Sequence, residues 1–169
     1  MEDPAPRGGL TPGLRAAQVC AALNGTGARY LVIGGVACIL HGHIRATIDV
    51  DILIEPTPEN VRRVLEALGT TGYGFAREWD PQEILRRPIT VIGDDPAIDL
   101  FTVAWTVRYD DAIHRSRRVR VDGVEIPLLS LDDLIASKRT GRLQDAADIE
   151  VLEEIRLIEV ERSRRSERL

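Results

Sequence analysis

Three scarcities narrow the classes of protein to which this sequence can belong: cysteine, lysine and long apolar runs. The two cysteines, Cys20 and Cys38, lie in apolar helical contexts and form neither a CxxC pair nor a Cys/His metal spacing. This pattern favours buried, reduced thiols in a cytoplasmic protein over a disulfide framework or a zinc site. No apolar stretch reaches the length of a membrane span, and the N-terminal segment MEDPAPRGG has no hydrophobic signal core. We therefore expect a cytoplasmic protein without a membrane partner.

An excess of basic residues is also lacking. The 22 basic residues are outnumbered by 27 acidic ones, which gives a formal net charge of −5. This balance argues against extensive contact with nucleic acid unless a local basic patch exists. The candidates for such a patch are Arg108, Arg115, Arg117, Arg118 and Arg120.

Lys138 is the only lysine among the 22 basic residues. The lysine ammonium is a compact point charge, whereas the arginine guanidinium is a planar fork, so a site that binds a phosphate oxygen through a point charge requires lysine. The alternative is a solvated helix face, on which Arg142 and Asp145 form an i, i+3 ion pair. The composition alone does not separate these two interpretations.

With 169 residues, 44% of them hydrophobic, the chain can bury one core. No internal repeat and no second domain is evident. We predict a single domain over residues 13–160. Residues 1–12, rich in proline and glycine, are predicted to be a disordered tail, and residues 161–169 a frayed charged tail.

Apolar periodicity and turn residues divide this domain into elements. Helices are predicted over residues 13–23, 36–41, 58–68, 79–87, 106–114, 130–138 and 142–160, and strands over 30–33, 49–54, 89–92 and 97–103, with a hairpin over 119–126 around Asp122-Gly123. The last helix is expected to pack on the core through an apolar stripe of Leu143, Ala147, Val151, Ile155 and Ile158.

Two aspartates alternate with apolar residues in the predicted strand that follows residue 48. Asp49 and Asp51 project from one face of this strand, and the isoleucines and valine beside them project from the other. Close carboxylates repel each other and are costly to desolvate, so we expect a cation between them. Ligands that are all oxygen atoms indicate magnesium, with manganese as the second choice. A solvated edge strand, the alternative, fits poorly with apolar residues on both sides.

A diglycine and a third aspartate extend this pattern. Gly34 and Gly35 join a predicted strand to a predicted helix, where backbone N–H groups can approach an anion closely. A lone diglycine is more often only a tight connection. Asp99 lies on another apolar strand. Three strand carboxylates together with a phosphate cradle form a pattern that an ordinary core does not require.

In their order and spacing these residues resemble the DNA polymerase beta-type nucleotidyltransferases. The signature of that superfamily is an apolar residue and a diglycine, then Asp-x-Asp on a strand, then an aspartate on a later strand. Here Ile33-Gly34-Gly35 is followed after thirteen residues by Asp49-Val50-Asp51, and later by Ile98-Asp99-Leu100. The segments RATIDVDILI and LLSLDDLIASKRTGRLQDAADIEVL also resemble small toxin-type members related to abortive-infection systems. The resemblance covers residues 30–152.

The resemblance implies an α+β fold with a nucleotidyltransferase-like mixed β-sheet flanked by helices. It also implies an enzyme that moves a nucleoside monophosphate from a nucleoside triphosphate to a hydroxyl acceptor and releases pyrophosphate. Asp49 and Asp51 would hold two magnesium ions against the triphosphate, and Asp99 would bind the catalytic metal and help to deprotonate the hydroxyl. Gly34 and Gly35 would place backbone donors on the outer phosphates.

Further residues complete the implied nucleotide site. Many members of the superfamily have serine or threonine at or just after the second glycine, where this chain has Val36. We expect Arg45 or Thr47 to replace the missing hydroxyl. In the toxin-type relatives the nucleotide site includes a lysine, an arginine and aspartates that match Lys138, Arg142, Asp145 and Asp148.

Two nearby histidines, His41 and His43, have no ligand partner at a useful spacing, and we predict structural or solvent-facing roles for both. Residues 69–87, which are turn-like, are assigned by position alone to the wall of the acceptor site.

The acceptor itself is left open, because the resembling families modify RNA ends, protein side chains or aminoglycoside and lincosamide antibiotics. Two other functions also stay open. One is a nucleotide-binding protein of the same fold with weak or lost turnover, suggested by the missing hydroxyl after Gly35. The other is an interaction subunit, such as one half of a toxin–antitoxin pair, whose carboxylates bind the arginines of a partner protein.

Overall fold

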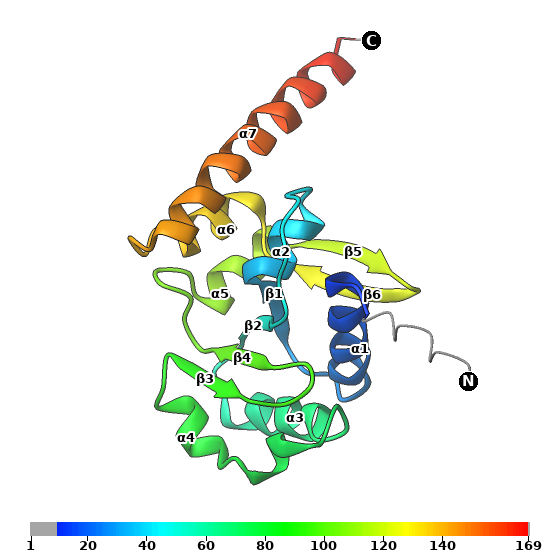
Figure 1. Ribbon diagram of the computed structural model, residues 1–169, viewed down its shortest axis with the longest axis vertical. Helices are drawn as coiled ribbons and strands as arrows, with labels where there is room; N and C mark the ends of the chain where they lie inside the picture. The colour runs from blue at the N-terminus through cyan, green and yellow to red at the C-terminus, as the bar shows by residue number, and fades with distance from the viewer. Residues whose placement is uncertain (1–9, 169) are drawn as a thin grey trace, which may run out of the picture.

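A six-stranded sheet runs through the molecule in the order β3-β4-β2-β1-β6-β5 (Figure 1). The computed structural model describes residues 10–168. The strands are β1 (Tyr30–Ile33), β2 (Val50–Ile54), β3 (Ile89–Ile92), β4 (Ile98–Phe101), β5 (Arg117–Val121) and β6 (Val124–Leu128). The pairs β1–β6 and β2–β4 are parallel, whereas β1–β2, β3–β4 and β5–β6 are antiparallel. The predicted mixed sheet is therefore confirmed.

Helices flank this sheet and join its strands. They are α1 (Pro12–Gly25), α2 (Gly34–Leu40), α3 (Pro58–Leu68), α4 (Pro81–Leu85), α5 (Tyr109–Ala112), α6 (Leu131–Ser137) and α7 (Leu143–Ser166), with 3-10 turns η1 (Phe75–Glu78) and η2 (Ile113–Arg115). Local chemistry fixes several of their starts. The side chains of Thr11, Thr57 and Ser130 accept backbone N–H groups at the N-termini of α1, α3 and α6, and proline follows the first two caps.

The central strands β1 and β2 lie within the core. All four residues of β1 are buried, as are the apolar residues of β2, which explains their near-continuous apolar sequences. Leu23 of α1 and Leu68 of α3 are fully buried in the same core. The sheet centre is thus well packed, and candidate site residues described below lie on or beside these strands.

Most predicted elements are present, with shifted ends. The predicted helix over 106–114 is reduced to α5 and η2, because residues 104–107 form a tight turn closed by two hydrogen bonds between Ala104 and Val107. The hairpin is longer than predicted. Its turn residues, Asp122 and Gly123, both have positive φ, at 50° and 77°, which suits an Asp-Gly hairpin turn.

The apolar stripe predicted for the C-terminal helix is wrong. Leu143 is 90% exposed, and the buried residues of α7 are Asp145, Asp148 and Leu152. The physical reason is that the first turns of α7 face the charged part of a cavity, where Asp145 and Asp148 form ion pairs with cationic side chains. The second half of α7 projects away from the sheet (Figure 1), so its apolar residues have little to pack against.

The first and last helices extend into the segments predicted as tails. Helix α1 begins at Pro12, and α7 continues to Ser166 instead of ending at residue 160. Residues 1–9 of the predicted N-terminal tail lie outside the described residues. None of the helices between residues 10 and 168 combines the length and the apolar content needed to cross a membrane.

Candidate active site

The sheet register brings the carboxylates together. Asp51 on β2 lies opposite Asp99 on the parallel neighbour β4, and Asp49 immediately precedes β2. Directly opposed residues of neighbouring strands project from the same face. All three aspartates line one cavity of about 750 Å³.

The same cavity gathers every residue that the sequence predicted for the site. Its lining includes Gly34, Gly35, Arg45, Thr47, Asp49, Asp51, Asp99, Lys138, Arg142 and Asp145. These residues come from segments spread over more than half of the chain: the β1–α2 junction, the segment before β2, strands β2 and β4, and the α6–α7 region. Their convergence is a property of the fold, and their individual roles stay predictions.

Close approach of the backbone explains the diglycine. Gly34 has a φ of +64°, and a Cβ atom built there would lie 1.9 Å from Oδ2 of Asp51. A Cβ atom on Gly35 would lie 2.7 Å from Oγ1 of Thr47. Both positions therefore exclude a side chain, and the first turn of α2 lies directly against two residues of the predicted site. No side chain caps this helix end.

Burial and mutual repulsion make ionisation of the central carboxylates less favourable. Burial, followed by the charges of Asp99 and Asp49, raises the pKa of Asp51 to about 7, against an opposing effect of Lys138. Burial and the charge of Asp49 also raise the pKa of Asp99. Oδ1 of Asp51 is buried without a hydrogen-bond partner. An unpaired buried carboxylate oxygen is costly, and a bound cation would remove that cost.

The donor chemistry fits a hard divalent cation, although the side chains are not arranged as a finished metal site. Among residues 10–168, no group of three histidine, cysteine, aspartate or glutamate side chains is close enough to hold a metal ion as it stands. The unpaired oxygen of Asp51 and the carboxylates of Asp49 and Asp99 on the same cavity wall are the oxygen ligands that magnesium and manganese prefer.

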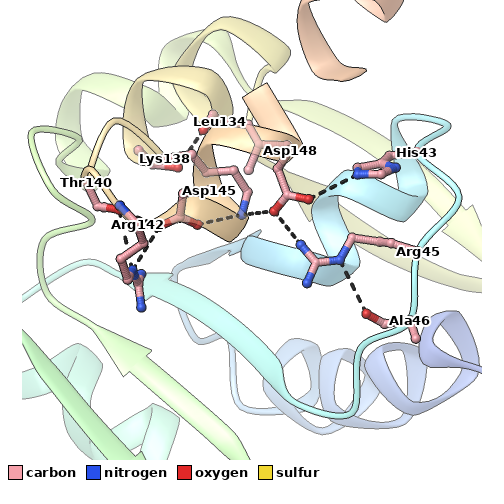
Figure 2. A network of polar contacts seen from close by, with 10 residues as sticks. His43, Arg45, Ala46, Leu134, Lys138, Thr140, Arg142, Asp145 and Asp148 are labelled. Carbon is pink, nitrogen blue, oxygen red and sulfur yellow. Dashed lines mark hydrogen bonds and ion pairs between the residues drawn. The ribbon is translucent and has the colours of Figure 1, made fainter. Parts of the chain in front are cut away.

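A buried ion network that includes Arg45, Lys138, Asp145 and Asp148 (Figure 2) forms part of the cavity lining. Asp148, 3% exposed, accepts hydrogen bonds from Nε2 of His43 at 3.0 Å, from Nζ of Lys138 at 2.7 Å and from Nη1 of Arg45. Lys138 also donates to Oδ1 of Asp145 at 3.3 Å. Burial lowers the pKa of Lys138, but its hydrogen bond and charge interaction with Asp148 outweigh that effect, so its pKa is raised above the usual value. The lysine is therefore charged.

These contacts argue against the solvated-face interpretation of Lys138, whereas its role as a phosphate ligand stays a prediction. Arg142 does form the expected i, i+3 pair with Asp145, through Nε at 2.9 Å, and its own side chain is mostly exposed. Lys138 is only 7% exposed, however, and Asp145 and Asp148 are buried as well. The face that carries them is not solvated. Thr140 adds a further hydrogen bond to Asp145.

Sequence reasoning missed the role of His43. Its Nε2 atom contacts Asp148, 105 residues away in the chain. His41 fits the structural role that was predicted, because it is buried and its Nε2 atom lies 2.8 Å from the carbonyl oxygen of Leu129. The only sequence signal for His43 is its position two residues before Arg45, which binds the same carboxylate.

The apolar wall of the cavity was also missed. It consists of Ile33, Pro88, Ile89, Phe101, Val103, Ala104 and Trp105. Residues 69–87, the predicted acceptor wall, do not line this cavity. The wall instead begins with the next two residues of the chain, Pro88 and Ile89.

Three of the five arginines that were candidates for a basic patch form ion pairs in the fold. Arg115 donates to both carboxylate oxygens of Asp133, at 3.0 and 2.9 Å. Arg117 makes an equivalent pair with Glu159, at 3.0 and 2.7 Å, and Arg118 pairs with Glu125. These ion pairs leave the region much less positive than its sequence suggests.

Comparisons with known proteins agree with this geometry. A protein family described as "Nucleotidyltransferase of unknown function (DUF6036)" matches residues 15–165. Among solved structures, an antigenic nucleotidyltransferase-like protein from Paracoccidioides brasiliensis is similar, with a TM-score of 0.54 and 14% sequence identity; the alignment covers 85% of this chain and 74% of that one. At that identity the likeness concerns the fold alone. A comparison with curated protein sequences found no match.

Proposed function

Because this chain belongs to the DUF6036 family of nucleotidyltransferases, we propose that its cavity binds a metal–nucleoside triphosphate and transfers the nucleoside monophosphate to a hydroxyl group. The observation that carries this proposal is the convergence of three carboxylates, a diglycine and a buried lysine on one cavity. An ordinary core has no need of that combination.

The charge of the cavity supports a metal-dependent reaction. Five carboxylates line it, on Asp49, Asp51, Asp99, Asp145 and Asp148, against three cationic side chains, on Arg45, Lys138 and Arg142. A triphosphate adds several negative charges to this excess, so it binds only together with additional positive charge. Magnesium, or manganese in its place, would supply that charge and polarise the reacting phosphate when held by Asp49, Asp51 and Asp99.

Two further tasks, binding of the outer phosphates and removal of the hydroxyl proton, would be carried out by different residues of the cavity. Lys138 and Arg45, now bound to Asp148, would turn toward the outer phosphates, with the backbone N–H groups of Gly34 and Gly35 beside them. Asp99 would accept the proton of the attacking hydroxyl at a carboxylate oxygen. The hydroxyl oxygen then bonds to the α phosphorus while the bond to the departing pyrophosphate breaks.

Thermal unfolding tests the binding step without an acceptor. We expect each bound nucleoside triphosphate to stabilise the purified protein in magnesium and not in EDTA, by about 2.7 kcal/mol at a hundredfold excess over Kd. A pyrophosphate-release assay run in parallel, with candidate hydroxyl acceptors, tests turnover. The base that gives the largest shift identifies the donor.

A carboxylate variant and a matched control test the site itself. The double variant Asp49→Asn/Asp51→Asn is expected to remove the magnesium-dependent shift and pyrophosphate release while the fold persists. Asp122→Asn is the control, because Asp122 lies in the β5–β6 turn, where asparagine suits the positive φ equally well. Unchanged nucleotide binding in the double variant would reject the metal site.

Two other functions predict different results in the same assays. A catalytically weak nucleotide-binding protein, suggested by Val36 in place of a hydroxyl, would show the shift without pyrophosphate release. An interaction subunit, such as one half of a toxin–antitoxin pair, would show no magnesium-dependent shift with any nucleotide and would be stabilised only by its partner protein.

A further inference from the structure

The carboxylate face of the sheet continues to an open, apolar edge. In the strand register, Asp51 of β2 lies opposite Asp99 of β4, which lies opposite Val91 of the edge strand β3; Ile89 lies opposite Phe101 in the same way. Opposed residues share a face, so the side chains of Asp99, Phe101, Ile89 and Val91 project to the same side of the sheet as that of Asp51. Ile89 and Val91 are large exposed hydrophobic residues. We call Ile89, Phe101 and Trp105, which line the cavity, and Val91, which lies outside its lining on the exposed edge strand, the apolar ledge.

Trp105 is the most unusual member of the ledge. It lines the cavity, and 58% of its surface is exposed. It lies at the first central position of the turn that the Ala104–Val107 hydrogen bonds close, both of them 2.9 Å long. Its φ is +58°, a value that glycine adopts easily and a bulky residue rarely does. Residues held in such conformations concentrate at functional sites.

The cavity therefore has two chemically distinct ends. Lys138, Arg45 and the Asp148 network lie at one end. The apolar ledge, which contains no charged side chain, extends beyond Asp99 toward the sheet edge. Phosphates suit the first end. The exposed indole of Trp105, which lines the same cavity as Ile89 and Phe101, suits a flat aromatic ring, because such a ring can lie against its face without giving up hydrogen bonds.

We propose that the apolar ledge is a nucleobase-stacking platform and that Trp105 is its main contact. The inference rests on the proposed function, because a nucleotide whose phosphates lie near Lys138 brings a nucleobase into this cavity. The base belongs either to the donor triphosphate or to the terminal nucleotide of a nucleic-acid acceptor. The recognising chemistry is the same in both cases, since every base offers a π face to the indole.

The first arm of the test compares nucleotides with an anion that has no base. Dissociation constants are measured by calorimetry, with magnesium, for the four nucleoside triphosphates and for inorganic tripolyphosphate. Trp105→Leu keeps an apolar side chain but removes the aromatic face, and Trp105→Phe keeps a ring. Tyr73→Ala is the control, because Tyr73 is an exposed aromatic residue that does not line the cavity. Thermal unfolding of each variant verifies its fold.

If the donor base stacks on the ledge, Trp105→Leu weakens triphosphate binding by about 5- to 100-fold, the range expected for one base on one aromatic ring. Tripolyphosphate binding stays unchanged, and Trp105→Phe recovers most of the loss. The chain has only two tryptophans. Triphosphates, but not tripolyphosphate, should therefore quench a fluorescence component that Trp105→Phe removes.

The second arm titrates short single-stranded RNA oligomers that end in each of the four bases. Loss of oligomer affinity in Trp105→Leu, with triphosphate affinity intact, assigns the platform to the acceptor base. If the variant binds triphosphates and oligomers as the wild type does, or loses tripolyphosphate equally, the stacking platform is rejected. If the wild-type protein binds neither tripolyphosphate nor any triphosphate, the proposed function is rejected instead. The oligomer titrations alone then show whether the apolar ledge binds a nucleobase.

Discussion

Asp51 is the residue of this site whose burial opposes folding most strongly. It lies at the centre of the sheet, opposite Asp99, with one carboxylate oxygen buried and unpaired. A purely structural strand would place an apolar residue here, because burying a carboxylate beside two others opposes folding. Protonation of Asp51 lowers this cost, and a bound cation would lower it as well.

The raised pKa of Asp51 predicts a specific dependence of stability on pH. The pKa of Asp51 is 3.8 in an unperturbed side chain and about 7 in the fold. The folded state therefore binds this proton more tightly than the unfolded state, and its stabilising effect, present below pH 4, is lost as pH rises toward 7. In EDTA we expect the free energy of unfolding to fall across this window, by at most about 4 kcal/mol at 1.36 kcal/mol per pH unit.

Urea unfolding at pH 4.5 and pH 7.5 measures this effect. The difference between the two pH values should be smaller in Asp51→Asn than in the wild type, because the variant has no proton to lose at this position. The same pH dependence in both proteins would show that Asp51 titrates normally.

Gly34 carries the second prediction at the residue scale. Alanine at this position must adopt a φ of +64° and would place its Cβ atom 1.9 Å from Asp51. The backbone conformation alone costs roughly 1–2 kcal/mol, and the collision adds to it. We expect Gly34→Ala to lower the free energy of unfolding by more than about 2 kcal/mol and to displace Asp51.

Gly93→Ala is the matched control in the same urea titrations. Gly93 does not have a positive φ, and a Cβ atom there would meet nothing within 4 Å. Equal stability of the two variants would mean that the diglycine does not approach Asp51 as described.

At the scale of elements, α7 differs most from an ordinary surface helix. Its first two turns bury Asp145 and Asp148 instead of apolar residues, because these carboxylates meet Lys138 and Arg45 across the cavity. Leu143, at the start of the same helix, faces solvent. The helix thus contributes charge to the site at one end and apolar packing only at its middle.

Two leucine substitutions on this helix test that division. Leu152→Ala should lower the free energy of unfolding by about 2–5 kcal/mol, because Leu152 is fully buried and its loss leaves a cavity. Leu143→Ala should change it by less than about 0.5 kcal/mol. The apolar stripe that periodicity predicted requires similar losses at both positions, so chemical denaturation of the pair distinguishes the two arrangements.

At the scale of the whole molecule, the candidate site and the distal half of α7 are separate. The cavity lies over the sheet and the start of α7, whereas the helix continues away from the body to Ser166 (Figure 1). Every residue from 161 to 168 is exposed. The fold and the cavity should therefore not depend on this segment.

A truncation after Val160 tests this independence. We expect the free energy of unfolding to stay within about 0.5 kcal/mol of the full chain, with the magnesium–nucleotide shift retained. A longer truncation after Glu150, which also removes the buried Leu152, is the contrasting variant and should unfold at a much lower temperature. Loss of nucleotide binding in the shorter truncation would place the distal helix within the site.

Local patterns in the sequence determined the parts of this protein that depend on near neighbours. The alternation around Asp49 and Asp51, the caps at Thr57 and Ser130 and the Asp-Gly turn each follow from the geometry of a few consecutive residues. The diglycine and three aspartates were likewise visible in order and spacing. The family match agrees with that pattern.

Tertiary structure alone decided which side chains meet. His43 and Asp148 are 105 residues apart, and no local rule pairs them. The buried face of α7 is acidic because of what lies across the cavity, so helical periodicity selected the wrong stripe. Trp105 lines the same cavity as Lys138 and Arg45, residues that lie far from it in the sequence. The physical reason is that periodicity describes one element, whereas burial and ion pairing depend on the elements packed against it.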